Sequence, residues 1–216
     1  MDFEVLLLIP VLLLSFTVHE FAHAWVARHE GDRTAERLGR VTLNPLPHID
    51  VFGTILVPAL LLATRAGFLI GWAKPVPVDP ANFRDERKSD LKVSLAGVGA
   101  NLALAVLLTL ATVVVVWARR SWPEAQLLGY LQFMMEAGIR LNFILVVFNL
   151  LPVPPLDGAR ALYRLLPARL AAGYARLQGA AMAVFLVLML TGWLGKVLWP
   201  AFLLDELSRS LIEWWT

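Results

Sequence analysis

Two histidines and a glutamate lie together in the pattern His19-Glu20-Phe21-Ala22-His23. Residues four apart share one face of an α-helix, so both imidazole rings can bind a single metal ion while Glu20 lies beside them. A zinc site that activates water needs such ligands and a nearby carboxylate that accepts the proton. The pattern therefore predicts hydrolytic zinc chemistry, with His19 and His23 as metal ligands and Glu20 as the general base.

The setting of this motif is apolar. The fourteen residues from Val5 to Val18 contain no charged side chain. A helix from Phe3 to about Ala27 is long enough, at ~1.5 Å per residue, to cross a ~30 Å hydrocarbon core. Ionisable groups in a membrane are costly unless they bind something, which favours a functional site. The alternative is a polar cluster that only holds helices together.

The composition is typical of a membrane protein. The chain has 216 residues, of which 58% are hydrophobic, and it contains no cysteine and four histidines. Any metal must therefore be held by histidines and carboxylates. The net charge of +2 is small and the basic residues form no single patch, so nucleic acid is not an expected partner. We expect one integral membrane domain over residues 1–216.

The fold class that we expect is all-α and polytopic, with about four transmembrane helices. Their approximate ranges are 3–27, 91–117, 127–150 and 179–199. Four arginines between 28 and 40 follow the first helix, and the positive-inside tendency places that end in the cytoplasm. Residues 1–4 lack the basic start of a signal peptide, so we expect the first segment to be retained.

The segment from 51 to 70 is predicted to be re-entrant. Its apolar part, residues 51–63, is short for a span and contains Gly53 and Pro58. If it crossed the membrane, Asp157 would lie on the opposite side from His23. A re-entrant segment places both at a similar depth near the cytoplasmic face, and it also keeps most basic residues inside.

Shorter elements complete the expected fold. Residues 40–43 are a possible short strand, and residues 68–78 are expected to be extended because Pro75 and Pro77 disfavour helix in their predecessors. After Pro200, leucines alternate with charged residues at helical spacing, and Trp214 and Trp215 end the chain. This pattern predicts an amphipathic helix at the membrane interface.

A proline-shaped segment follows the third predicted span. Three prolines between 152 and 155 force an irregular backbone, which at membrane depth is tolerated only in a packed or cavity-lining position. The segment delivers Asn149 and Asp157. Asn149 could donate its amide to an oxyanion that forms on a peptide carbonyl. The alternative is that Asn149 only satisfies a backbone group near Pro152.

Five residues are candidates for the third metal ligand: His29, Glu30, His48, Asp50 and Asp157. Asp157 is preferred, because its proline-shaped loop returns to the depth of the histidines. The others remain open, with His29 and Glu30 favouring the solvated face and His48 and Asp50 lying near the start of the re-entrant segment. The structural alternative for Asp157 is an N-cap for the helix that follows.

With these motifs the chain closely resembles the site-2 protease family of intramembrane zinc metalloproteases. The matching motifs are residues 19–23, the small-residue run 96–101, and the segment from Asn149 to Gly158. They cover a three-helix catalytic core at about 3–28, 91–118 and 126–158. The family usually has proline where this chain has Val98, which alters the helix entry and touches no proposed ligand.

The resemblance implies a set of roles. One zinc ion is bound by His19, His23 and Asp157, Glu20 is the general base, and Asn149 helps to hold substrate or transition state. The substrate is a transmembrane protein or membrane peptide. The stretch 44–83 looks like a compact bacterial branch without a PDZ or CBS domain, which implies the inner membrane with an active site towards the cytoplasm.

Two other function classes remain open. A metal transporter or channel could use the same histidines and aspartate as a transit site, but it would need further metal positions along a path. A non-catalytic scaffold would not need Glu20. The single cluster with its adjacent base favours hydrolysis over both.

Overall fold

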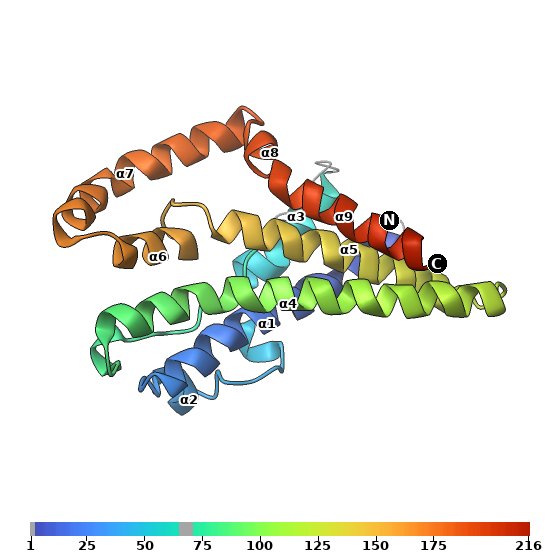
Figure 1. The fold of residues 1–216 in the computed structure, drawn as a ribbon, viewed down its shortest axis with the longest axis horizontal. Coiled ribbons are helices and arrows are strands. Elements are labelled where there is room, and N and C mark those ends of the chain that lie inside the picture. Colours follow the sequence, from blue (N-terminus) through green and yellow to red (C-terminus); the bar gives the residue numbers. More distant parts are fainter. Residues whose placement is uncertain (1–2, 65–70) are drawn as a thin grey trace. The chain divides into compact units, whose positions relative to one another are not determined.

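The computed structural model describes residues 3–64 and 71–216, and the regular secondary structure in that part of the chain is helical (Figure 1). The predicted all-α class is confirmed. The elements follow the order α1 (Phe3–His29), α2 (Thr34–Arg37), η1 (Leu46–His48), η2 (Val51–Leu56), α3 (Val57–Ala63), η3 (Pro80–Asn82), α4 (Glu86–Ser121), α5 (Gln126–Asn149), α6 (Asp157–Leu165), α7 (Ala168–Leu190), α8 (Leu194–Val197) and α9 (Trp199–Trp215).

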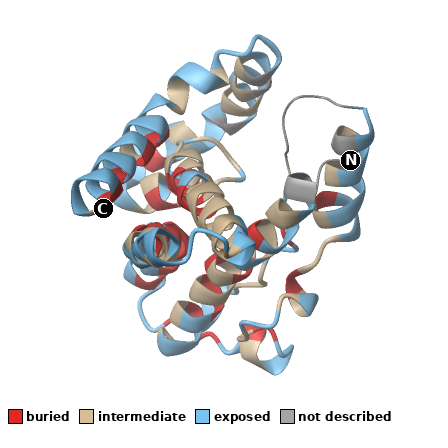
Figure 2. Ribbon diagram, turned by 90° about the vertical axis from the view of Figure 1, so that its right-hand side faces the viewer, coloured by how far each residue is buried: buried red, intermediate tan, exposed pale blue. Residues whose placement is uncertain are grey.

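Three helices are long and apolar enough to cross a membrane: α1, α4 and α5. They correspond to the first three predicted spans. Each of them carries apolar residues that are exposed, and Figure 2 marks exposed positions of the chain in pale blue. On α4 the exposed apolar residues are Leu102, Val106, Leu107, Leu110, Val114 and Trp117. Exposed apolar area on this scale is typical of a surface that contacts lipid.

The fourth predicted span differs from the structure. The helix in this region, α7, begins at Ala168 and ends at Leu190, whereas the expected range was 179–199. Gly192 follows with a φ of 74°, a left-handed conformation that glycine adopts without steric cost and that ends the helix. Among the described residues, α7 is not one of the three helices that qualify as spans.

The chain divides into two compact units, one of residues 1–12 with 98–216 and the other of residues 13–97. The first unit has a core in which α4, α5 and α9 meet. Ala105, Ile139, Phe143, Ala201 and Ile212 form this cluster. Small residues on α4 and α9 let these helices pack closely.

A buried pair of asparagines joins α4 to α5 within this unit. Asn101 Nδ2 donates to Asn142 Oδ1 at 2.6 Å, and Asn142 Nδ2 donates to the Gly138 carbonyl at 2.8 Å. Both asparagines are fully buried. A polar side chain in an apolar helix requires such a partner.

Helix α9 packs along α5, as Figure 1 shows. Asp205 is buried in this contact and pairs with Arg140 at 3.0 Å and Arg209 at 3.3 Å. The leucines at 203, 207 and 211 are exposed. The acidic residue therefore faces the neighbouring helix and the leucines face outward. The interfacial position of this helix stays a prediction.

The second unit contains a helical excursion that returns to its starting point. Asp50 caps the turn through the Gly53 N–H at 2.7 Å, and η2 and α3 lead away from it. The chain is back at residue 72, whose N–H donates to the Gly53 carbonyl at 3.1 Å. The Thr54 hydroxyl donates to the Trp72 carbonyl at 2.8 Å. A re-entrant segment requires that its two ends lie close together, as these hydrogen bonds hold them. Residues 65–70 of the predicted re-entrant segment lie outside the described part.

The predicted strand at 40–43 is not formed, because these residues make bends and pair with no neighbouring strand. Residues 71–79 contain no helix and no strand, so no β-strand forms in the described part of the predicted extended piece. Residues 68–70 of the predicted extended piece lie outside the described residues.

Candidate active site

The two histidines of the motif lie one turn apart in α1 and face each other. Their Nε2 atoms are 3.0 Å apart, and the ring centroids are separated by 4.6 Å with the rings nearly perpendicular. Each side chain is only 9% exposed. Tetrahedral zinc ligands at ~2.0–2.1 Å from the ion lie roughly 3.3 Å from one another. The spacing of the two nitrogens therefore fits one zinc ion, and nitrogen donors suit that metal.

The ring of His23 is fixed from behind. Its Nδ1 lies 2.7 Å from the backbone carbonyl oxygen of Val93, near the start of α4. A carbonyl can only accept a hydrogen bond, so Nδ1 of the neutral ring carries the proton and Nε2 carries the lone pair. Metal-binding histidines are usually oriented by such a second contact. The contact therefore prepares the Nε2 of His23 to act as a ligand.

Helix α4 lies close to the two rings at Gly97. A Cβ atom at this position would lie 2.5 Å from His19 Cε1, 2.5 Å from His23 Nε2 and 2.6 Å from His19 Nε2. Ordinary van der Waals contacts of carbon begin near 3.5 Å. Only glycine leaves room here for both imidazoles, which gives Gly97 of the small-residue run a chemical reason.

Glu20 follows His19 directly and is half-buried. Its Oε2 accepts a hydrogen bond from the backbone N–H of Val76 at 2.7 Å. The proposed base is thus held by the extended segment that follows the excursion, and one carboxylate oxygen is engaged in that contact.

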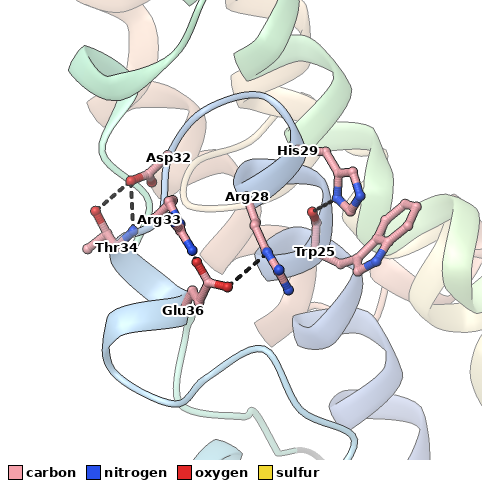
Figure 3. Close-up of polar contacts among 7 residues, drawn as sticks. All are labelled: Trp25, Arg28, His29, Asp32, Arg33, Thr34 and Glu36. Carbon is pink, nitrogen blue, oxygen red and sulfur yellow. Dashed lines mark hydrogen bonds and ion pairs between the residues drawn. The ribbon is translucent and has the colours of Figure 1, made fainter.

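The candidates at the end of α1 are engaged elsewhere. His29 Nδ1 lies 2.8 Å from the Trp25 carbonyl, one turn back in the same helix, and the ring is exposed (Figure 3). Glu30 accepts hydrogen bonds from Lys92 and Ser89, both at 2.7 Å. The bond from Lys92, followed by that from Ser89, lowers the pKa of Glu30. Both residues have structural roles at the end of the helix.

The candidates near the excursion also have structural roles. His48 is buried, with Nε2 3.0 Å from the Thr42 carbonyl and Nδ1 3.5 Å from an Arg40 nitrogen. The Asp50 carboxylate caps η2 through Gly53. Within residues 13–97, these contacts account for the ring nitrogens of His48 and one oxygen of Asp50.

Asp157 belongs to the other unit, where it is the first residue of α6. The N-cap position is occupied by Leu156, so the structural alternative of Asp157 as the N-cap residue is not what the structure shows. The start of α6 packs against the end of α5, because a Cβ on Gly158 would collide with the backbone of Leu150. This close approach fixes the position of the start of α6, and with it the backbone of Asp157.

Asn149 ends α5. One of its N–H groups donates to the Leu145 carbonyl at 3.0 Å, one turn back in the helix. An amide side chain has two N–H donors, so this bond leaves the second one for another acceptor.

The backbone groups of Val93 and Val76 are the parts of the site that sequence reasoning missed. Backbone atoms carry no side-chain signal, and Val93 lies in an ordinary helical pattern. For Val76 a signal was present, since its flanking residues Pro75 and Pro77 have no N–H and make it a lone donor.

Comparison with known proteins supports a family assignment. The sequence model of peptidase family M50 matches residues 115–192, a range that contains Asn149 and Asp157. No solved structure matches the chain.

Several relatives carry the name "Putative zinc metalloprotease". YwhC of Bacillus subtilis is 42% identical over 193 residues, which is 89% of this chain and 84% of the relative. Rip2 of Mycobacterium tuberculosis is 32% identical over 205 residues, covering 92% of this chain and 74% of the relative. Rip2 of Mycolicibacterium smegmatis is 35% identical over 160 residues, covering 73% of this chain and 56% of the relative. The chain therefore belongs to peptidase family M50, the site-2 proteases.

Proposed function

We propose that His19, His23 and Asp157 hold one zinc ion in this intramembrane zinc metalloprotease and that Glu20 is its general base. The observation that carries the proposal is the convergence of the two Nε2 atoms at 3.0 Å, with His23 fixed through its Nδ1. A pair of histidines that only joined helices would not need both nitrogens directed at one point beside a glycine.

The choice of Asp157 as third ligand rests on two arguments. The other four candidates, His29, Glu30, His48 and Asp50, make hydrogen bonds that explain their presence. Asp157 lies in the Asn149–Gly158 motif by which the chain resembles its family. A carboxylate also completes a two-histidine, one-carboxylate set that suits catalytic zinc.

The chain's own residues then divide the reaction between them. Bound zinc supplies Lewis acidity at the scissile carbonyl and lowers the pKa of water. Glu20 accepts the proton of the attacking water through a carboxylate oxygen and passes it to the leaving amine. The second N–H of Asn149 donates to the oxygen on which negative charge develops.

The substrates that we propose are membrane-spanning proteins or peptides, cut in or near the bilayer. A transmembrane helix hides its carbonyls in internal hydrogen bonds, so it must unwind locally before cleavage. The basic residues that follow α1 and precede α4 favour a site towards the cytoplasmic face of a cell membrane.

Purified protein in liposomes tests the assignment. The Glu20→Gln variant should retain one zinc ion per chain, measured by elemental analysis, and should lose cleavage of a reconstituted membrane-spanning substrate. His19→Ala and His23→Ala should lose both zinc and cleavage. The matched control is His29→Ala on the same helix, which should keep both.

Undiminished cleavage by Glu20→Gln would remove Glu20 from the mechanism. Zinc uptake into the liposomes by wild-type protein and by Glu20→Gln alike, without cleavage by either, would favour a transporter.

A further inference from the structure

The Glu20 carboxylate is held by a residue far along the chain. The N–H of Val76 donates to Glu20 Oε2 at 2.7 Å across fifty-six positions of sequence. Hydrogen bonds to an ionised acceptor are roughly twice as strong as neutral ones. The contact engages one oxygen of the carboxylate and leaves the other for a proton from water.

The sequence around Val76 restricts which group can make this contact. Pro75 and Pro77 have no N–H, so Val76 is the one amide donor of the three residues. Each proline also biases its predecessor towards an extended backbone, which fixes Lys74 and Val76 in that conformation. The two prolines therefore restrict the backbone conformation of the segment without any tertiary contact. The segment presents a single N–H to Glu20.

Alternate residues of this segment are fastened to the rest of their unit. The Trp72 N–H donates to the Gly53 carbonyl at 3.1 Å, and the Lys74 N–H donates to the His48 carbonyl at 2.9 Å. Residues two apart in an extended chain point to the same side. Val76 is the next residue in this series, and its acceptor is a side chain of the motif instead of a structural backbone carbonyl.

Further contacts hold the segment on either side of Val76. Arg40 donates to the Lys74 carbonyl at 2.7 Å. The buried Asp32 accepts from the Asp79 N–H at 2.8 Å and from Asn82 Nδ2 at 3.0 Å. These contacts fix the position of the Val76 amide independently of Glu20. The amide can therefore orient the Glu20 carboxylate.

We propose that Val76 is a positioning residue for peptide hydrolysis, and that its backbone N–H holds the Glu20 carboxylate in the orientation used for proton transfer. The inference rests on the proposed role of Glu20 as the base. A base must lie within ~2.6–3.2 Å of the atom whose proton it takes. Loss of the contact lets the carboxylate rotate, which slows the proton transfer without changing substrate or metal binding.

An amide-to-ester substitution at Val76 tests this directly. Incorporation of the α-hydroxy acid analogue of valine removes the N–H and keeps the side chain. We expect kcat for a membrane-spanning substrate to fall by ~10–100-fold, the usual effect of losing an outer contact in a metal site. KM and zinc content should be unchanged.

The matched control is the same substitution at Lys74, which removes a structural hydrogen bond of the same segment. It should lower thermal stability as much as the Val76 ester and leave kcat intact. A second test uses an ordinary variant: Val76→Pro lacks the N–H and should be slow, with zinc content as in wild type.

Three results would overturn the proposal. They are an equal loss of kcat in the Lys74 ester, a loss of zinc in the Val76 ester, or a wild-type rate for Val76→Pro. Full activity in the Val76 ester with an inactive Glu20→Gln would reject this positioning role and leave the proposed function standing. An active Glu20→Gln would reject both.

Discussion

The two regions that carry the proposed chemistry are held in different ways. His19, Glu20 and His23 lie within a long helix, and partners from distant segments fix them. Asp157 begins a short helix after a proline-rich loop, and local contacts fix that loop. They include the approach of Gly158 to Leu150.

This difference separates what local sequence determines from what tertiary structure must supply. Helical spacing alone places the two histidines on one face. Their precise orientation depends on a carbonyl of α4 and on a glycine of α4, which no local pattern reveals. For Asp157 the reverse is true. Local contacts fix the loop that carries Asp157, but nothing in the sequence spacing sets the distance between Asp157 and the histidines.

The largest expected effect comes from filling the space beside the histidines. In Gly97→Ala the new Cβ would lie within 2.5–2.6 Å of both imidazole rings. His23 cannot yield without losing its bond to Val93. We expect zinc affinity to fall by ~10–100-fold or more, and cleavage with it. Competition with a zinc chelator measures the affinity.

Gly99→Ala, two residues along the same helix, is the control. A Cβ at this position meets no atom within 4 Å. The change should raise helix stability by up to ~1 kcal/mol and leave zinc affinity as in wild type. Equal zinc affinity in the two variants would contradict the close approach at Gly97.

A smaller effect is expected in the loop. In Gly158→Ala the Cβ would collide with the Leu150 carbonyl, and the backbone must shift. Such overpacking typically costs about 1–3 kcal/mol. Thermal unfolding in detergent should show the loss of stability. If Asp157 is a ligand, zinc affinity should fall as well.

Gly173→Ala in α7 serves as the comparison, since its Cβ would meet no atom within 4 Å. Destabilisation of Gly158→Ala without any change in zinc affinity would separate Asp157 from the metal. An unchanged unfolding temperature would show that the start of α6 is less tightly packed than described.

The smallest effect concerns Asp32, which anchors the segment that holds Glu20. Burial on its own raises the pKa of Asp32, but hydrogen bonds from Thr34, Asp79 and Asn82 outweigh it, and the pKa is lowered. The folded pKa thus lies below the unfolded value of ~3.9. The resulting stability is present above that value and is lost as the pH falls through the folded pKa.

Asp32→Asn should therefore unfold at a lower temperature than wild type at neutral pH, and the two curves should converge as the pH falls below about 4. Glu124→Gln, at an exposed position, is the control and should follow wild type throughout. A constant difference between Asp32→Asn and wild type at all pH values would contradict an ionised Asp32 as the anchor.

Much of the fold could be predicted from the sequence, because a long run of apolar residues indicates a long helix. The three long apolar helices α1, α4 and α5 were correctly predicted. Other parts depended on tertiary contacts. Arg140 pairs with Asp205 of α9, and no sequence pattern indicates which helix will lie beside another. The strand at 40–43 failed because a strand needs a neighbour that this segment lacks.

The candidate site divides in the same way. The proline-shaped loop and the family resemblance favoured Asp157, whereas residue type and spacing were enough to propose His19, Glu20 and His23. They could not exclude His48, because its role becomes clear only when Thr42 and Arg40 are found beside it. Backbone groups, such as the Val93 carbonyl that fixes His23, are present at every position of a sequence, and only the folded structure shows which of them contribute to a site.

Zinc K-edge X-ray absorption on the purified wild-type protein tests the central claim most directly. Two imidazoles in the first shell, with the remaining ligands oxygen and one zinc per chain, are the predicted result. Asp157→Asn should alter the oxygen shell and keep both imidazoles. Three imidazoles would place His29 or His48 on the metal, and fewer than two would contradict the histidine pair.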